Sequence, residues 1–133
     1  MFSSIFNQGR FLKVEVAETS FSHARGLMFR KRIPEDSGML FKFRSPQKLK
    51  FWGLNTFMPL DIAFVSSDNK ITKISKINPL SISLVSSDID CLMAIECNFN
   101  FFSKNKILTG NKINIIKKDI DTFVIFEKER GKK

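Results

Sequence analysis

The sequence predicts a mostly-β domain: a sandwich or barrel of about seven short strands with one or two short helices. Two observations support this fold class. Short segments of alternating apolar and polar residues recur along the chain, and turn-forming residues separate them. In addition, 43% of the 133 residues are hydrophobic, which supplies a core for one domain without disulfides or metals.

The first third of the chain is expected to form a strand, a helix and a hairpin. Residues 11–17 alternate apolar and charged side chains, which indicates a half-buried strand. Thr19 or Ser20 is suited to capping the short amphipathic helix that follows. Residues 39–52 then alternate on both sides of a Ser-Pro-Gln sequence at 45–47, which predicts a hairpin.

The rest of the chain is expected to form further strands joined by turns. Residues 61–66 and 70–77 predict a second hairpin, because the Ser-Asp-Asn sequence at 67–69 tolerates the dihedral angles of a tight turn. The remaining expected elements are a strand at 91–97, a short helix within 98–106, and strands at 112–117 and 121–126.

These elements predict a single domain at residues 11–127, between an N-terminal extension at 1–10 and a charged tail at 128–133. No apolar run approaches the ~20 residues of a membrane-spanning helix. The N-terminal segment lacks the basic cluster and the continuous apolar stretch of a secretory signal. We therefore expect a cytoplasmic protein, and nothing in the sequence indicates its oligomeric state.

The chain carries a formal net charge of +9. Part of the excess is an acid-free block that contains Lys42, Arg44, Lys48 and Lys50 and ends beside Trp52. Basic residues next to an exposed aromatic ring are suited to binding phosphates and stacking a base, so nucleic acid or another polyanion is one candidate partner. A compositional bias toward lysine, asparagine, isoleucine and phenylalanine explains the same excess without a partner.

Counting residues excludes most catalytic and metal-binding arrangements. The chain has one histidine, His23, and two cysteines, Cys91 and Cys97. A zinc site needs three or four converging ligands, and the six scattered glycines form neither a phosphate-binding loop nor a dinucleotide fingerprint. The cysteines are expected on one face of one strand, roughly 20 Å apart, as buried thiols too distant for a disulfide. We therefore expect no cofactor and no metal site, and we assign no catalytic residue.

Residues 51–65 concentrate polar side chains among large apolar ones, which is typical of a built site or a structural corner. Asp61 in this segment, and Glu96 further along, adjoin apolar residues where an unpaired charge is costly, and Arg30 is the expected counter-ion. Such a buried pair either orients a small polar ligand or ties the irregular segment structurally. The candidate ligand-binding residues are Arg30, Trp52, Asn55, Thr56, Asp61 and Glu96.

Several collinear segments resemble the prokaryotic family catalogued as domain of unknown function 192. They lie at residues 14–17, 24–30 followed by 33–43, 51–64 and, more weakly, 95–96 with 110–111, so that the resemblance spans about residues 12–116. The resemblance implies a compact mostly-β sandwich or barrel, and it implies no particular activity. Many members of that family carry an N-terminal export signal or anchor.

The chain departs from the family pattern at two places. After Phe-Trp the family usually has Met-Lys-Asn-Thr, and Gly53 and Leu54 stand in place of the first two of these residues. The Gly-Asp near the end of the family pattern is Gly110-Asn111 in this chain. Loss of a lysine and a carboxylate, with the other polar positions kept, favours binding over catalysis.

Three functions stay open at this point. The first is binding of a small polar ligand around residues 51–61, with Trp52 as a stacking surface. The second is binding of nucleic acid or another polyanion by the basic block. The third is an enzyme, a hydrolase or lyase in which Asp61 or Glu96 acts as general acid or base.

Overall fold

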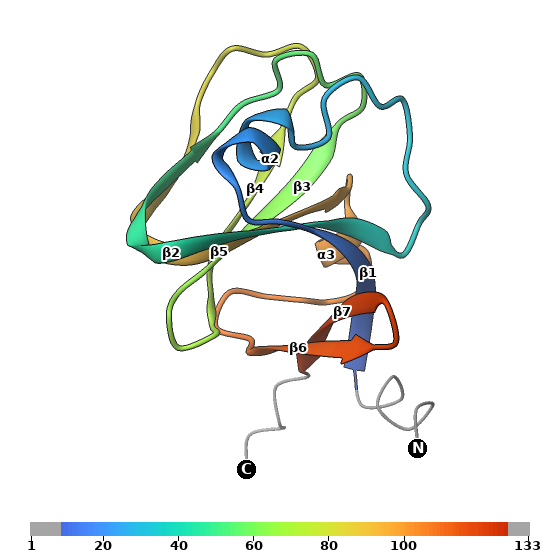
Figure 1. Ribbon diagram of the computed structural model, residues 1–133, viewed down its shortest axis with the longest axis vertical. Helices are drawn as coiled ribbons and strands as arrows, with labels where there is room; N and C mark the ends of the chain where they lie inside the picture. The colour runs from blue at the N-terminus through green and yellow to red at the C-terminus, as the bar shows by residue number, and fades with distance from the viewer. Residues whose placement is uncertain (1–8, 128–133) are drawn as a thin grey trace.

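A computed structural model of the chain describes residues 9–127. They form one strongly curled sheet of seven strands in the order β4-β3-β5-β2-β1-β7-β6, with two short helices (Figure 1). Neighbouring strands are antiparallel except β1 and β2, which are parallel. The predicted mostly-β fold is confirmed. The elements are β1 (Gly9–Ala17), α2 (Ser20–Arg25), β2 (Ser37–Phe51), β3 (Leu60–Val65), β4 (Ile71–Ile77), β5 (Val85–Asn98), α3 (Phe101–Lys104), β6 (Ile113–Lys118) and β7 (Asp121–Glu127).

The two edges of the sheet approach each other just before β4 and β6. Lys70 and Lys112 form an isolated antiparallel bridge there. The backbone N–H of Ile71 donates to the carbonyl oxygen of Asn111 at 2.9 Å, and the N–H of Ile113 donates to that of Asn69 at the same distance. These contacts satisfy backbone groups that an open edge would expose. The sheet is therefore an incomplete barrel rather than a flat layer.

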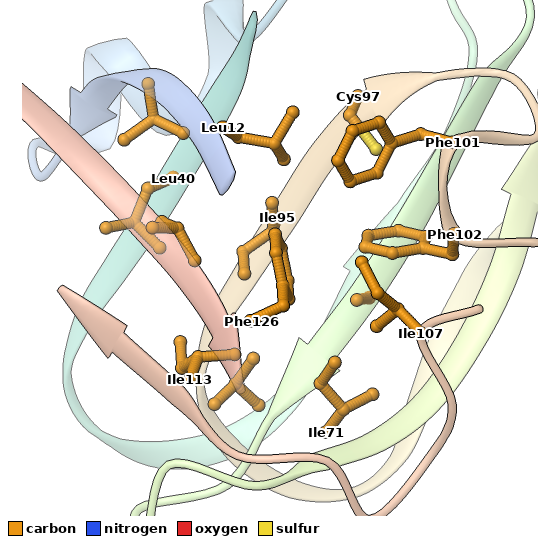
Figure 2. Close-up of a cluster of buried hydrophobic side chains, with 14 of the residues drawn as sticks. Leu12, Leu40, Ile71, Ile95, Cys97, Phe101, Phe102, Ile107, Ile113 and Phe126 are labelled. Carbon is orange, nitrogen blue, oxygen red and sulfur yellow. The ribbon is translucent and has the colours of Figure 1, made fainter. Parts of the chain in front are cut away.

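Apolar side chains pack on both faces of this sheet. One cluster takes side chains from all seven strands, and Phe101 and Phe102 of α3 join it. Figure 2 shows Leu12, Ile95 and Phe126 of this cluster directed into the interior of the curl. A second cluster lies on the opposite face of β2, β3 and β5, since successive side chains of a strand point to opposite faces. The second cluster underlies the cavity described below.

Helix α2 forms as the sequence predicts. Thr19 is the N-cap residue: its hydroxyl oxygen accepts a hydrogen bond from the N–H of Ser22 at 3.0 Å, and its own N–H donates to the hydroxyl of Ser22 at 2.9 Å. This reciprocal pair is a capping box built with serine. Gly26 ends the helix with a φ of 48°, a conformation that costs little for glycine.

The hairpin predicted at residues 39–52 is wrong. β2 is a single strand, and it pairs with β5 both before and after an irregularity. Lys42 pairs with Met93 and Gln47 with Cys91, so β2 advances five residues there while β5 advances two. Pro46 cannot donate a hydrogen bond to the ladder, and the extra residues bulge out of the strand instead of reversing it. The second predicted hairpin, β3 with β4, is confirmed.

The same irregularity separates the two cysteines. Both are free and buried, as expected. However, Cys91 belongs to the cluster under the cavity and Cys97 to the cluster inside the curl. The expectation that they share one face is wrong, because the strict alternation on which it depended is interrupted where the β2–β5 register shifts.

Gly53 allows the loop before β5 to pack against the loop after β2. Its N–H donates to the carbonyl oxygen of Ser81 at 2.9 Å, and its carbonyl oxygen accepts from the N–H of Leu80 at 2.8 Å. A Cβ atom on Gly53 would lie 1.9 Å from the carbonyl oxygen of Asn78. The two loops could not keep this contact with any larger residue.

Gly53→Ala is therefore expected to lower the free energy of unfolding by about 1–3 kcal/mol, the usual cost of overpacking against backbone. Urea unfolding followed by the fluorescence of the single tryptophan, Trp52, measures the change. Ser83→Ala, at an exposed position of the facing loop before β5, is the matched control and should change stability by less than about 0.5 kcal/mol. Equal stability of Gly53→Ala and the wild type would contradict the packing argument.

Candidate functional site

A cavity of about 440 Å³ lies between α2, the turn that follows it, β2 and the loop after β2. Its lining includes Trp52, Thr56 and Glu96, three of the six residues predicted as ligand-binding. The lining also includes aromatic side chains of β2, among them Phe43 and Phe51. The structure thus brings half of the predicted site together around one hollow.

Glu96 is the buried carboxylic acid of this cavity. It lies in the middle of the sheet, where its neighbours across the ladders are Met39 on β2 and Ile62 on β3. Only 5% of the residue is exposed, and no group within residues 9–127 forms a hydrogen bond or ion pair with its carboxyl group. Burial alone raises the pKa of Glu96 from 4.5 to about 8. At neutral pH the group is therefore mainly a neutral acid, with a proton to donate.

Thr56 is the second unpartnered polar side chain of the cavity. It is also 5% exposed, and among the described residues its hydroxyl group has no hydrogen-bond partner. Of the other buried polar residues, Asp61, Ser87 and Asn111 have partners for their side chains, and Thr122 of β7, outside this cavity, has none in the described part of the chain. In the described part of the chain, no fully enclosed side-chain nitrogen or oxygen lacks a partner. The polar atoms of Thr56 and Glu96 are consequently reached from the cavity.

Basic side chains surround the same hollow. Arg25 of α2 and Lys48 and Lys50 of β2 are exposed and line it. None of the three forms an ion pair with an acidic side chain in the described part of the chain. The positive charges are thus not neutralised by the protein at contact distance.

His23 fixes α2 over β2 and closes one side of the cavity. Its Nε2 atom lies 3.0 Å from the carbonyl oxygen of Ala17 and 2.8 Å from that of Lys42. Carbonyl oxygens only accept, so Nε2 carries the proton. The imidazole ring also stacks on Phe43, with ring centroids 4.1 Å apart and an interplanar angle of 27°. The polar side of α2 thus faces the strand, and none of the residues of α2 is buried.

Trp52 provides an aromatic surface at the cavity. The residue is 42% exposed, so part of the indole ring is open to solvent and part is covered by neighbours. Phe51, next in the strand, packs edge-on against Phe41 with ring centroids 4.9 Å apart. The walls therefore combine a partly open indole with rings that are held in place by the core.

Asp61 lies away from this cavity. It is 1% exposed, and its carboxylate forms an ion pair with Nζ of Lys76 at 2.6 Å. The other carboxylate oxygen accepts a hydrogen bond from the backbone N–H of Phe102 at 3.2 Å, in the first turn of α3. Asp61 therefore ties β3 to β4 and to α3, with both oxygens occupied.

Arg30 and Asn55 are also placed outside the cavity lining. The guanidinium of Arg30 donates to both carboxylate oxygens of Glu15, at 2.5 and 2.7 Å. These bonds hold the pKa of Glu15 below its ordinary value. The expected pairing of Arg30 with Asp61 or Glu96 is wrong. Asn55 adopts a φ of 58°, and its carbonyl oxygen accepts from the N–H of Phe29 at 2.7 Å, so it shapes the loop.

The basic block of the sequence is divided by the structure. Lys48 and Lys50 line the cavity described above, whereas Lys42 lines a second one of about 560 Å³ beside the Glu15–Arg30 pair. Arg44 lies between them in the irregular part of β2. A role of these four residues in binding nucleic acid stays a prediction.

His23 and Arg25 belong to the cavity but were not among the predicted site residues. Their sequence signal was only the short helix itself. Which side of that helix meets β2 depends on the hydrogen bonds of His23 to carbonyl groups of two other segments. No spacing pattern within α2 carries this information.

Residues 9–127 contain neither a candidate metal site nor a candidate membrane-spanning helix. No group of three or more histidine, cysteine, aspartate or glutamate residues there is placed to hold a metal ion. Neither helix of that region has the length and apolar character that a membrane crossing requires.

The fold and the site define a small mostly-β domain with a cavity that is lined by the buried polar residues Thr56 and Glu96. The chain belongs to the DUF192 family, described as "Uncharacterized ACR", whose sequence model matches residues 3–115. The resemblance seen in the sequence is thereby confirmed. Leu54, which stands where the family pattern usually has lysine, lines the same cavity as Glu96.

Two solved structures are similar to this chain. One is a protein of unknown function from Novosphingobium aromaticivorans, with 32% identity and a TM-score of 0.74, over 76% of this chain and 73% of that one. The other is a protein from Sinorhizobium meliloti described as a candidate transcription regulator, with 28% identity and a TM-score of 0.73, over 84% and 80% of the two chains. No curated protein matches the chain at a significant level.

Proposed function

We propose that this protein binds a small polar molecule in the cavity between α2, β2 and the loop after β2. The observation that carries the proposal is the pair of buried, unpartnered polar groups, Thr56 and Glu96, in the lining of one hollow. Both groups are reached from the cavity, and the protein offers neither of them a hydrogen-bond partner within the described residues. A polar ligand in the cavity can therefore form hydrogen bonds with both of them.

The rest of the lining suits such a ligand. Its volume of about 440 Å³ falls within the usual range of small-molecule sites, roughly 300–1,000 Å³. The partly exposed indole of Trp52 is available for stacking. The proposal keeps Trp52, Thr56 and Glu96 from the predicted set, and it gives Arg30, Asn55 and Asp61 no direct contact with the ligand.

A fragment screen tests the proposal. Small polar fragments are added to ¹⁵N-labelled protein, and the amide shifts of Gly26, Leu54 and Thr56 report binding in the cavity. Because Trp52 is the single tryptophan and the chain has no tyrosine, its fluorescence gives a second readout. We expect fragments that shift these amides and perturb Trp52 together, with dissociation constants in the range of about 0.1–10 mM, typical of fragment-sized ligands.

The matched variants are Thr56→Val and Ser83→Ala. Thr56→Val keeps the shape but removes the hydroxyl group, and it should weaken the binding of fragments that depend on that group. Ser83 is exposed and outside the cavity, so Ser83→Ala should bind as the wild type does. A screen in which every fragment shifts amides elsewhere, and none in the cavity, would refute the proposal.

Acid–base catalysis is the second candidate function, and the raised pKa of Glu96 favours it. A carboxylic acid with a pKa of about 8 is poised to exchange a proton near neutral pH, as a general acid in a hydrolase or lyase does. Asp61 is less suited to this role, because its carboxylate is already occupied. This candidate function requires that the protein converts a cavity-binding fragment or its ester into a product. Glu96→Gln should abolish this conversion while it still binds the fragment.

A further inference from the structure

We infer that the cavity recognises a small planar carboxylate, whose anionic oxygens accept a hydrogen bond from the acid group of Glu96 while its planar part packs against Trp52. This inference rests on the proposed function and names the chemical class of the ligand. It is carried by three features of the lining: the sign of its charges, the lack of a counter-ion for Glu96, and the position of the aromatic rings.

The charges around the cavity favour an anion. Its ionisable groups are His23 and Arg25 on α2, Lys48 and Lys50 on β2, and Glu96 on β5. From β3 no ionisable group faces the cavity, since Ile62 is the ladder neighbour of Glu96 and Asp61 contacts Lys76 and Phe102 instead. With Glu96 protonated, the fixed charges of the lining are all positive. The overall charge of +9 adds a long-range attraction for anions.

The isolation of Glu96 distinguishes an anion from a cation as the ligand. A carboxyl group built to bind an ammonium ion must be ionised, but Glu96 is 5% exposed and no cationic group lowers its pKa. An ammonium ion would also have to pass the basic residues Arg25, Lys48 and Lys50. A carboxylate meets neither obstacle. It accepts a hydrogen bond from the acid group of Glu96, and such an O–H···O⁻ bond is roughly twice as strong as a bond between neutral groups.

The aromatic lining indicates a planar partner. The indole of Trp52 is half open, and the ring of Phe43 is held by the stacked imidazole of His23. Both side chains belong to the same lining as Glu96. A flat ring gains dispersion and stacking energy against such surfaces without needing further hydrogen bonds. Thr56 supplies a hydroxyl group for a second oxygen of the carboxylate.

The test compares four probes of similar size and different charge: benzoate, benzamide, benzylamine and phenyl phosphate. Binding is measured at pH 7 and low salt from the amide shifts of Gly26, Leu54 and Thr56. We expect benzoate to bind at least about fivefold more tightly than benzamide and benzylamine. Its affinity should fall about tenfold between pH 7 and pH 9, because benzoate is already ionised and only the acid form of Glu96 donates.

Variants separate the contributions to benzoate binding. Lys50→Gln should weaken it about three- to fivefold, the range of an exposed charge pair, whereas Lys104→Gln, an exposed site on α3 away from the cavity, should not weaken it. Glu96→Gln keeps a hydrogen-bond donor at the site, so it should remove the loss of affinity above pH 8. Glu96→Ala should bind benzoate weakly throughout.

Several outcomes would overturn the inference while leaving the proposed function intact. Tighter binding of benzylamine than of benzoate, strengthening above pH 8 and lost in Glu96→Gln, would identify a cation site. Tighter binding of phenyl phosphate would reassign the class to phosphate esters. Tighter binding of benzamide than of benzoate would show that the negative charge of the ligand does not determine its affinity. If no probe shifts the cavity amides and the fragment screen also fails there, both the inference and the proposed function are refuted.

Discussion

The free energy of unfolding of the wild-type protein should fall with rising pH, relative to Glu96→Gln, by about 1.4 kcal/mol per pH unit between about pH 5 and pH 8. The reason is that Glu96 has a pKa of about 8 in the folded protein, against an ordinary value of 4.5. Between these values the unfolded chain releases this proton and the folded protein retains it. The total difference across the interval is roughly 5 kcal/mol.

The direction of the effect follows from proton binding. Below pH 4.5 both states hold the proton, and the group has no effect on the pH dependence of stability. As the pH rises toward 8, the unfolded state binds fewer protons than the folded state, so stability decreases. Above that pH the carboxylate is ionised in both states, and no further loss occurs.

Urea unfolding at several pH values, for wild type and Glu96→Gln in parallel, measures this slope. All other ionisable groups are common to the two proteins, so their contributions largely cancel in the difference. Glu35→Gln, an exposed site, is the matched control and should follow the wild-type curve closely. Parallel curves for wild type and Glu96→Gln would mean that Glu96 is ionised in the folded state, contrary to its burial without a partner.

Leu54→Lys offers an independent check of the same explanation. Leu54 and Glu96 line one cavity, so a lysine at position 54 would add an ammonium group to the lining that contains the carboxyl group. An opposite charge lowers the pKa of a buried acid. The variant should therefore lose much of the pH dependence seen in the wild type. An unchanged slope would show that residue 54 and Glu96 do not interact.

Asp61→Ala should lower the free energy of unfolding by about 1–3 kcal/mol, the cost of leaving a buried donor unsatisfied. The variant removes the acceptor of the Phe102 N–H, in the first turn of α3, and the partner of Lys76. Because Lys76 is 43% exposed, its ammonium group can turn toward water, so the ion pair adds little to the loss. The buried backbone contact is the main contribution.

Thermal and urea unfolding of Asp61→Ala measure this loss, with Asp90→Ala at an exposed position of β5 as the control. Asp61→Asn should be milder, because its amide oxygen still accepts from Phe102. The ligand affinity of any Asp61 variant that remains folded should match the wild type, since the residue does not line the cavity. If a fully stable Asp61→Asn protein lost ligand binding, Asp61 would have to be counted among the residues of the binding site.

Glu96 and Asp61 show how far the sequence leads. Both were recognisable as acids among apolar residues, and both are buried as expected. The sequence did not separate their roles, because these roles depend on which groups lie next to each carboxyl group in the folded chain. Lys76 and the N–H of Phe102 meet Asp61 through ladder pairing and the placement of α3, whereas no group of the described chain pairs with the carboxyl group of Glu96.

By itself the sequence determined the fold class, the capped helix, the β3–β4 hairpin and the family. Each of these depends on local alternation, on turn chemistry or on motifs contiguous along the chain. The tertiary structure alone decided that β2 continues through Pro46, that Arg30 pairs with Glu15, and that Trp52, Thr56 and Glu96 share a cavity. These contacts join residues far apart in sequence, and their geometry depends on strand register and sheet curl, which no local pattern encodes.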